Sequence, residues 1–207
     1  MHVYEATEKT LEGVRSHPWR TAIYDLTCRC YDFKAHPELI PTVLEDFLPW
    51  AKYPAVQDFY SYLVWLNGPE SELESNDSAF AGVQRNLSPN FTPSPLQASG
   101  RLMLFFRSLA RNCEQANSDW LYQCFLFYLK RVQPDLQLGV IGVSRTHTEF
   151  VALKRRKGTS LVLNFWSWGE TETEVMSNLQ TVISALREAS IEVCTDIRNA
   201  NSRGSES

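Results

Sequence analysis

The sequence predicts an α+β fold in which a helical middle region packs on a mostly antiparallel sheet. Three observations predict this class. Near the N-terminus, apolar and polar residues alternate as in a strand with one buried face. In the middle of the chain, apolar residues recur at helical spacing. The last third combines short alternating runs with one amphipathic helix. The sheet is expected to join the N-terminal strand to a C-terminal β-β-β-α-β unit, since that strand needs partners.

The first third of the chain is expected to hold a short polar helix at residues 5–15 and a strand at residues 21–30. Alternation in the strand would turn Cys28 and Cys30 into the core. The chain has 5 cysteines, an odd number that favours buried reduced thiols over a disulfide framework. These two cysteines and His36 are too few ligands for a structural zinc site. No metal site and no cofactor are therefore expected.

The middle of the chain is expected to be helical. One helix begins near Pro41, and a second carries an apolar stripe that ends at the breaker Asn67-Gly68-Pro69. A further helix over residues 118–132 has Ser118 as its N-cap and apolar side chains around most of its circumference. Residues 101–111 fit a helix and a strand equally well, because a short apolar run does not separate the two.

Residues 67–100 are predicted to form a long polar loop. The stretch is rich in Ser, Asn and Pro, and neither a period of 2 nor one of 3.6 runs through it. Compact domains rarely hold a structureless connection much longer than about 15 residues unless it is functional or disordered. We therefore expect the working surface of the protein to include this segment.

The last third is expected to form a β-β-β-α-β unit. Its strands are residues 138–144, 149–154, 160–168 and, after the helix, 191–195. Turns are placed at residues 145–148, which include His147, and at Lys157-Gly158. Thr171 with Glu174 forms a capping box that starts the helix. The basic run at residues 154–157 is interpreted as a charged turn. Residues 1–198 are expected to form a single domain, and residues 199–207 a disordered tail.

Composition and charge narrow the class of protein. The net charge of −4 argues against a dedicated nucleic-acid binder, which usually has a basic domain or stripe. No run approaches the roughly 18 apolar residues that a transmembrane helix needs, and the first residues do not resemble a signal peptide. The chain is therefore expected to be cytoplasmic, without membrane or nucleic-acid partners. Nothing in the sequence predicts its oligomeric state.

The chemical motifs are weak. The chain lacks a phosphate-binding loop, a nucleophile elbow and an HExxH motif, so no class of enzyme is indicated. The strongest candidate site is the acidic-amide cluster in the polar loop, together with an arginine that follows it: Glu72, Glu74, Asn76, Asp77 and Arg101. Carboxylates and amides in a loop are able to bind a partner or act as acid and base, but they more often only cap a turn.

Two hypotheses follow from these residues. The first is a protein-interaction module, for example an inhibitor or an immunity-type protein, that binds a basic partner protein through the acidic loop. The second is an enzyme of unknown class whose site lies between the loop and the sheet, with Glu74 or Asp77 as acid or base and Arg101 as substrate anchor. We prefer the first. A weaker idea is that Trp166 and Trp168 stack on a sugar or a base, although packing under the last helix is the preferred interpretation.

Overall fold

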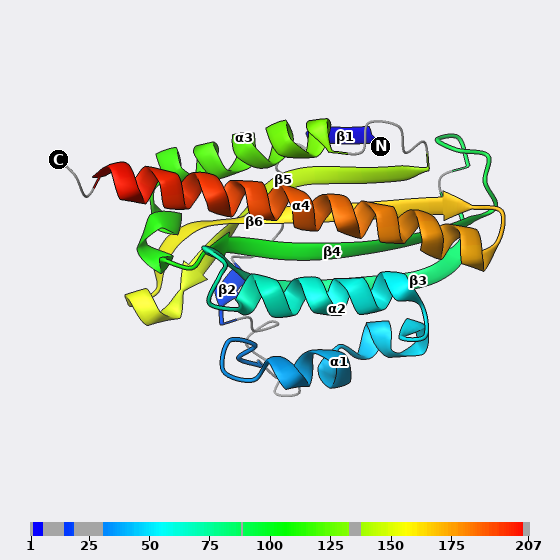
Figure 1. Ribbon diagram of the computed structural model, residues 1–207, viewed down its shortest axis with the longest axis horizontal. Coiled ribbons are helices and arrows are strands. Elements are labelled where there is room, and N and C mark those ends of the chain that lie inside the picture. Colours follow the sequence, from blue (N-terminus) through cyan, green and yellow to red (C-terminus); the bar gives the residue numbers. More distant parts are fainter. Residues whose placement is uncertain (1, 6–14, 19–30, 88, 133–137, 205–207) are drawn as a thin grey trace.

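The computed structural model of the chain describes residues 2–5, 15–18, 31–87, 89–132 and 138–204 (Figure 1). Its centre is a six-stranded sheet in the order β1-β5-β6-β4-β3, with β2 beside β5. The four long strands pair antiparallel, whereas β1 and β2 run parallel to β5. The strands are β1 (His2–Glu5), β2 (Arg15–His17), β3 (Leu73–Arg85), β4 (Leu96–Phe106), β5 (Gly139–Phe150) and β6 (Arg156–Gly169).

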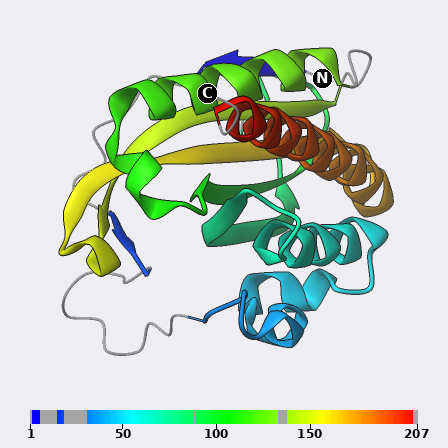
Figure 2. The ribbon, with the colours of Figure 1, turned by 60° about the vertical axis from the view of Figure 1, so that its left-hand side comes forward.

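Three long helices cover one face of this sheet, as Figure 2 shows from the side. They are α2 (Pro54–Asn67), α3 (Gln115–Arg131) and α4 (Glu172–Gly204). Shorter helical segments are η1 (Pro37–Leu39), α1 (Ile40–Val43), η2 (Glu45–Trp50), η3 (Leu109–Cys113) and η4 (Val151–Leu153). We call the sheet face that is turned away from the long helices the reverse face. The predicted α+β class with a mostly antiparallel sheet is confirmed.

The core lies between the sheet and the long helices. Leu102, Leu163 and Phe165 from the sheet meet Phe59 of α2 and Val182 of α4, all of them buried. Two local predictions are confirmed here. Helix α2 ends at Asn67, where the Gly68 amide donates to the Trp65 carbonyl. At the start of α4, the Glu174 amide donates to the Thr171 hydroxyl at 3.2 Å, as a capping box requires.

The predicted loop at residues 67–100 is wrong, because most of this segment forms β3 and the first half of β4. Two register shifts, between Ser75 and Asp77 and between Phe80 and Val83, break the alternation of β3. The polar side chains of β3 form hydrogen bonds and ion pairs with residues distant in sequence. The local sequence of β3 therefore lacks the pattern by which a strand is predicted. The connection between the two strands is only residues 86–95. Residues 101–106 belong to β4, which settles the open choice in favour of a strand.

The C-terminal unit also differs from its prediction. Two long strands, β5 and β6, replace the three short ones, and His147 lies within β5 rather than in a turn. The turn falls at η4, where Lys154 and Arg155 have φ of 56° and 62°, and not at Lys157-Gly158. The sequence suggested an extra turn because residues 145–149 are polar. Thr146 and Thr148 are nevertheless buried, and the Thr148 hydroxyl bonds that of Ser160 at 2.7 Å.

The predicted last strand at residues 191–195 is part of α4. Val193, Cys194 and Ile197 are buried and continue the apolar helical face that begins at Val175 and Leu179. Isoleucine and valine favour strands only weakly, and the tertiary contacts of this face outweigh that preference. The helix continues to Gly204, so the predicted disordered tail is wrong for residues 199–204. Residues 205–207, the strand predicted at 21–30, and residues 6–14 of the predicted N-terminal helix lie outside the described residues.

Candidate functional site

The structure brings four of the five predicted site residues onto the reverse face. Glu74, Asn76 and Asp77 lie on β3, and Arg101 lies on the neighbouring strand β4. Glu72 instead precedes β3, where its carbonyl accepts from the Arg107 amide. The prediction that these residues gather is therefore correct for four of them, although they gather across a sheet and not within a loop.

Glu74 is the most deeply buried of these groups, at 2 % exposed. Lys34 donates to its Oε2 at 2.8 Å, and Nε2 of His17 lies 3.4 Å from its Oε1. The other ring nitrogen of His17 lies 3.1 Å from the side-chain oxygen of Asn76. The Asn76 amide in turn donates to the Ser16 carbonyl at 3.1 Å. The cluster thus fastens β2 and the segment near Lys34 to β3.

Aromatic rings complete this cluster. The imidazole of His17 contacts the buried ring of Phe105 edge-on, with centroids 4.6 Å apart, and the ring of Phe150, which packs against Phe105, lies 6.0 Å from it. In these apolar surroundings an unpaired carboxylate would be costly, and the neighbouring lysine and histidine supply the pairing that burial demands. The primary role of the cluster that this geometry supports is therefore to hold strands together.

The second pair on the reverse face is Asp77 with Arg101. The two side chains form an ion pair and a hydrogen bond between adjacent strands. The Nε of Arg101 is buried and makes no hydrogen bond with the described part of the chain. Because Asp77 already occupies the guanidinium, Arg101 is poorly placed to anchor an anionic substrate.

A metal site is not evident in the described ranges, which hold no group of three or more histidine, cysteine, aspartate or glutamate side chains suited to an ion. Cys28 and Cys30 lie outside those ranges, while Cys113, Cys124 and Cys194 are free thiols. Among the described helices, none combines the length and the apolar character that crossing a bilayer requires.

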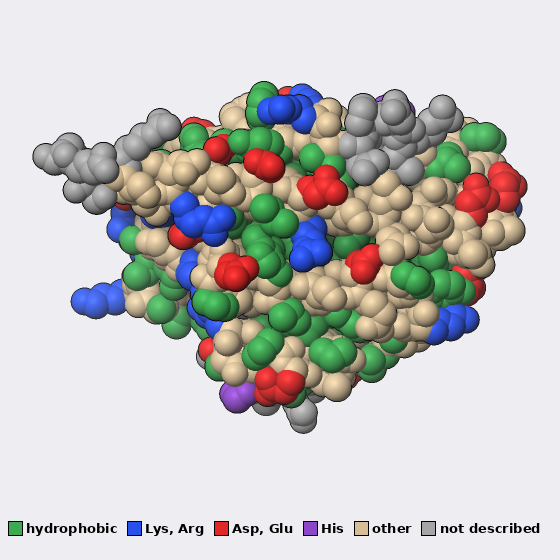
Figure 3. Space-filling view, viewed as in Figure 1, with side chains coloured by type: hydrophobic (Ala, Val, Ile, Leu, Met, Phe, Trp, Pro, Cys, Tyr) green, Lys and Arg blue, Asp and Glu red, His purple; other side chains and the backbone are tan. Residues whose placement is uncertain are grey.

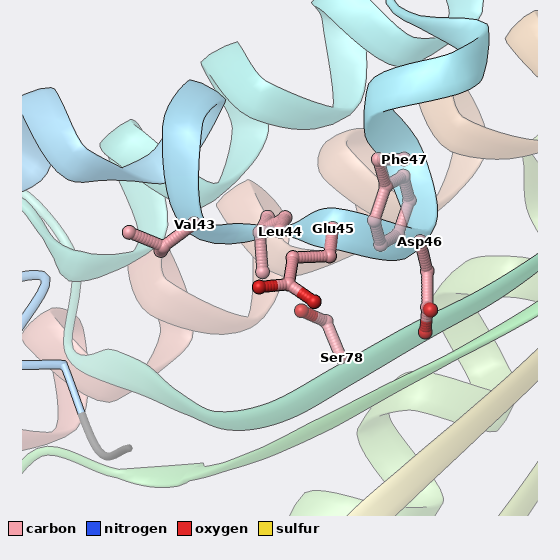
Figure 4. A pocket seen from close by; sticks show the side chains of 6 residues that line it. All are labelled: Val43, Leu44, Glu45, Asp46, Phe47 and Ser78. Atoms are coloured by element: carbon pink, nitrogen blue, oxygen red, sulfur yellow. The ribbon is translucent and has the colours of Figure 1, made fainter. Parts of the chain in front are cut away.

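The sequence analysis missed a second polar region, at the edge of the sheet beside β3. A hollow of about 220 Å³ lies between η2 and β3, lined by Val43, Leu44, Glu45, Asp46, Phe47 and Ser78 (Figure 4). The Glu45 side chain points toward the Ser78 hydroxyl, and the Asp46 side chain points toward β3. Both carboxylates are exposed, and neither forms an ion pair with a described residue. Leu48, also exposed, follows them on η2.

The hollow lies in the most acidic part of the chain. Residues 37–80 hold eight carboxylates and one lysine, which gives −7, whereas the whole chain carries −4. The carboxylates are Glu38, Glu45, Asp46, Asp58, Glu70, Glu72, Glu74 and Asp77, and the lysine is Lys52. In Figure 3, several Lys and Arg side chains gather toward the left-hand end of the helix face, while carboxylates lie among apolar side chains over α1 and α2. A charge count along the chain was the signal that could have located this region.

Comparison with known proteins adds no assignment. The chain matches no protein-family model, no curated protein and no solved structure. The function is therefore argued from the site alone.

The free thiols give one testable consequence of this packing. Burial and the nearby Asp196 charge raise the pKa of Cys124 to about 11, and burial raises the pKa of Cys194. Since only the thiolate is alkylated, iodoacetamide at pH 8 should modify Cys124 roughly a hundredfold more slowly in the native protein than in guanidinium. Peptide mass spectrometry measures both rates. Equal rates in the two solvents would contradict the burial of this thiol.

Proposed function

We propose that this chain is a non-enzymatic binding protein that recognises a basic protein partner through its acidic region. The observation that carries the proposal is the charge of −7 within residues 37–80, which becomes −5 when Glu74 and Asp77 are counted together with their partners Lys34 and Arg101. The remaining residues of the chain are net positive in either count. Such an asymmetry attracts a basic partner and orients it during encounter. An inhibitor or immunity-type role in the cytoplasm is the form of this function that we favour.

The free carboxylates of the region define where the contact is expected. Lys34 neutralises Glu74 and Arg101 neutralises Asp77, so these two carboxylates contribute little to the surface potential. Glu45 and Asp46 are exposed and have no cationic partner among the described residues. We therefore centre the interface on η2 and the hollow beside Ser78, and not on the acidic-amide cluster.

Apolar side chains accompany these charges. Leu48 is exposed next to the two carboxylates, and Phe47 packs directly beneath them against Phe59 and Phe80, with ring centroids 4.8 and 5.0 Å away. A binding surface commonly combines a few apolar anchors with a polar rim. The stacked rings below η2 keep the backbone of this segment in place, which lowers the entropy lost on binding.

One observation supports the alternative function, an enzyme with a carboxylate-based site. His17 lies between Glu74 and Asn76, and a histidine oriented by one partner is a common general base. Lys34 nevertheless binds the same carboxylate, and the packed rings of Phe105 and Phe150 lie against the imidazole. With these neighbours around it, the His17 ring has no evident position beside it for a substrate. We therefore rank the enzyme alternative second.

Affinity capture from a lysate of the native host tests the preferred function. The immobilised wild type is compared with a Glu45→Lys/Asp46→Lys variant and with Glu188→Lys/Glu192→Lys, which makes the same charge change on exposed positions of α4. One basic protein should be captured by the wild type and by the α4 variant and lost from the η2 variant. Retention of the same protein by all three baits would contradict an interface at η2, and capture of none would contradict the binding function.

A further inference from the structure

Aromatic side chains form a continuous strip along the reverse face. The rings of Phe91 and Trp168 lie 5.3 Å apart, and those of Tyr4 and Trp166 lie 6.1 Å apart. Trp166 and Trp168 are two residues apart on β6 and project to the same face, about 7 Å from each other. We call these four residues the aromatic strip. The helix-covered core is filled by Phe165 from the other face of β6, so the expected packing of both tryptophans under α4 is wrong.

A glycine in β5 lets the Tyr4 ring of the strip lie close to the backbone. Gly142 of β5 pairs with Tyr4 of β1, and a Cβ atom at this position would come within 2.7 Å of the tyrosine ring. Without that atom the ring lies over the strand toward Trp166. This close approach explains why glycine suits position 142.

Hydrogen bonds from buried side chains hold the described residues of the connection that carries Phe91. The Asn86 side chain donates to the carbonyls of Thr92 at 2.9 Å and Ser94 at 2.8 Å, and it accepts from the Trp168 indole at 3.3 Å. The Gln97 side chain accepts from the Leu87 amide at 3.1 Å. These buried polar groups fix the connection between β3 and β4, at the right-hand end of the sheet in Figure 1.

Large apolar side chains of this connection, and Tyr4 on β1, are nevertheless exposed. Leu87 is 71 % exposed, Phe91 61 % and Tyr4 43 %. A pre-ordered segment that presents aromatic side chains to solvent loses little entropy when a ligand covers them. Phe91, Trp166 and Tyr4 therefore have the properties of a binding surface, whereas Trp168 is buried, at 4 % exposed, and supports the Phe91 ring from below.

The polar neighbours of the strip are uncharged. In the sheet register, Ser99 lies opposite Trp166, and Asn164 lies opposite Arg101. Both side chains are partly exposed and make no hydrogen bond with a described residue, so their donors and acceptors are available. Arg101, the residue opposite Asn164, is already neutralised by Asp77. The sheet register places no other described cation beside Ser99 and Asn164, so a phosphate group bound at these two residues would lack an unpaired positive charge next to it.

We propose that the aromatic strip binds a neutral carbohydrate, with sugar rings stacked on Phe91, Trp166 and Tyr4 and hydroxyl groups bonded to Ser99 and Asn164. The electron-rich faces of aromatic rings attract the weakly positive C–H groups of a sugar ring. Hydroxyl and amide side chains match the hydrogen-bonding groups of sugars without requiring a charge. This site is separate from the acidic region around η2 and does not depend on the function proposed for it.

Titration with defined oligosaccharides tests the site. Chitohexaose, cellohexaose and maltohexaose are added at millimolar concentration, and binding is followed by tryptophan fluorescence and calorimetry. At least one should bind the wild type and shift its fluorescence, because Trp166 faces the ligand and Trp168 lies directly under the Phe91 ring. Phe91→Ala and Tyr4→Ala should each weaken that binding by about tenfold or more.

Phe127→Ala serves as the matched control, because this exposed phenylalanine lies on α3, outside the strip. It should leave oligosaccharide binding unchanged. The proposal is overturned if none of the three sugars binds, or if binding survives both strip substitutions. It is also overturned if a hexathymidylate oligonucleotide binds the strip and the sugars do not, since the ligand would then carry phosphate.

Discussion

Replacing Phe165 by alanine is expected to lower the free energy of unfolding by about 3–5 kcal/mol. The ring is fully buried in the centre of β6 and lies 6.0 Å from the ring of Phe59 on α2. It fills the space above Gly100, where a Cβ atom would come within 2.4 Å of it. Alanine would leave a cavity at the point where the sheet meets α2, and rigid neighbours on both sides would prevent it from closing.

Urea unfolding followed by circular dichroism measures this effect. Phe127→Ala provides the control, because it removes the same side chain from a position on α3 that is 54 % exposed. We expect the control to lose less than about 1 kcal/mol. Equal losses for the two variants would contradict the assignment of Phe165 to the core.

Replacing Glu74 by glutamine is expected to destabilise the protein by about 2 kcal/mol. The substitution preserves shape but removes the charge that pairs with Lys34 and His17. Lys34 is 42 % exposed and regains water when its partner is neutralised, so the loss should stay below that of a fully buried pair. The effect follows from the structural role that we assign to this carboxylate.

Glu72→Gln is the matched control for Glu74→Gln, because the same chemical change occurs two residues away, where no ion pair is formed with a described residue. Thermal and urea unfolding of both variants should show a clear loss only for the substitution at position 74. If the two variants unfold alike, the cluster around Glu74 does not stabilise the fold in the way that we infer.

Segments with an uninterrupted period were predictable from the sequence. Helix α2 has regular apolar spacing and a glycine at its end, and the start of α4 has both a cap and a stripe. Strand β3 was missed because its bulges break the period and its polar side chains find partners far along the chain, such as Lys34 for Glu74. The end of α4 was missed because β-branched residues there suggested a strand.

The candidate site, too, could be predicted from the sequence only in part. The sequence correctly drew attention to Glu74, Asn76, Asp77 and Arg101, but it could not show that these charges neutralise one another across the sheet. Ion pairing between distant residues depends on register, which the bulges of β3 shift. Conversely, Glu45 and Asp46 drew no attention as isolated residues. They became candidates only when the structure placed them beside Ser78 with no cationic partner in the described part of the chain.

The most direct test of an acidic binding surface is the affinity for the captured partner, measured by calorimetry at two ionic strengths. We expect Glu45→Lys/Asp46→Lys to raise the dissociation constant by at least about tenfold and to weaken its salt dependence. The α4 variant Glu188→Lys/Glu192→Lys should remain within about twofold of the wild type at moderate salt, since its charges lie outside the proposed contact. Equal affinities for the wild type and the η2 variant at both ionic strengths would contradict the account.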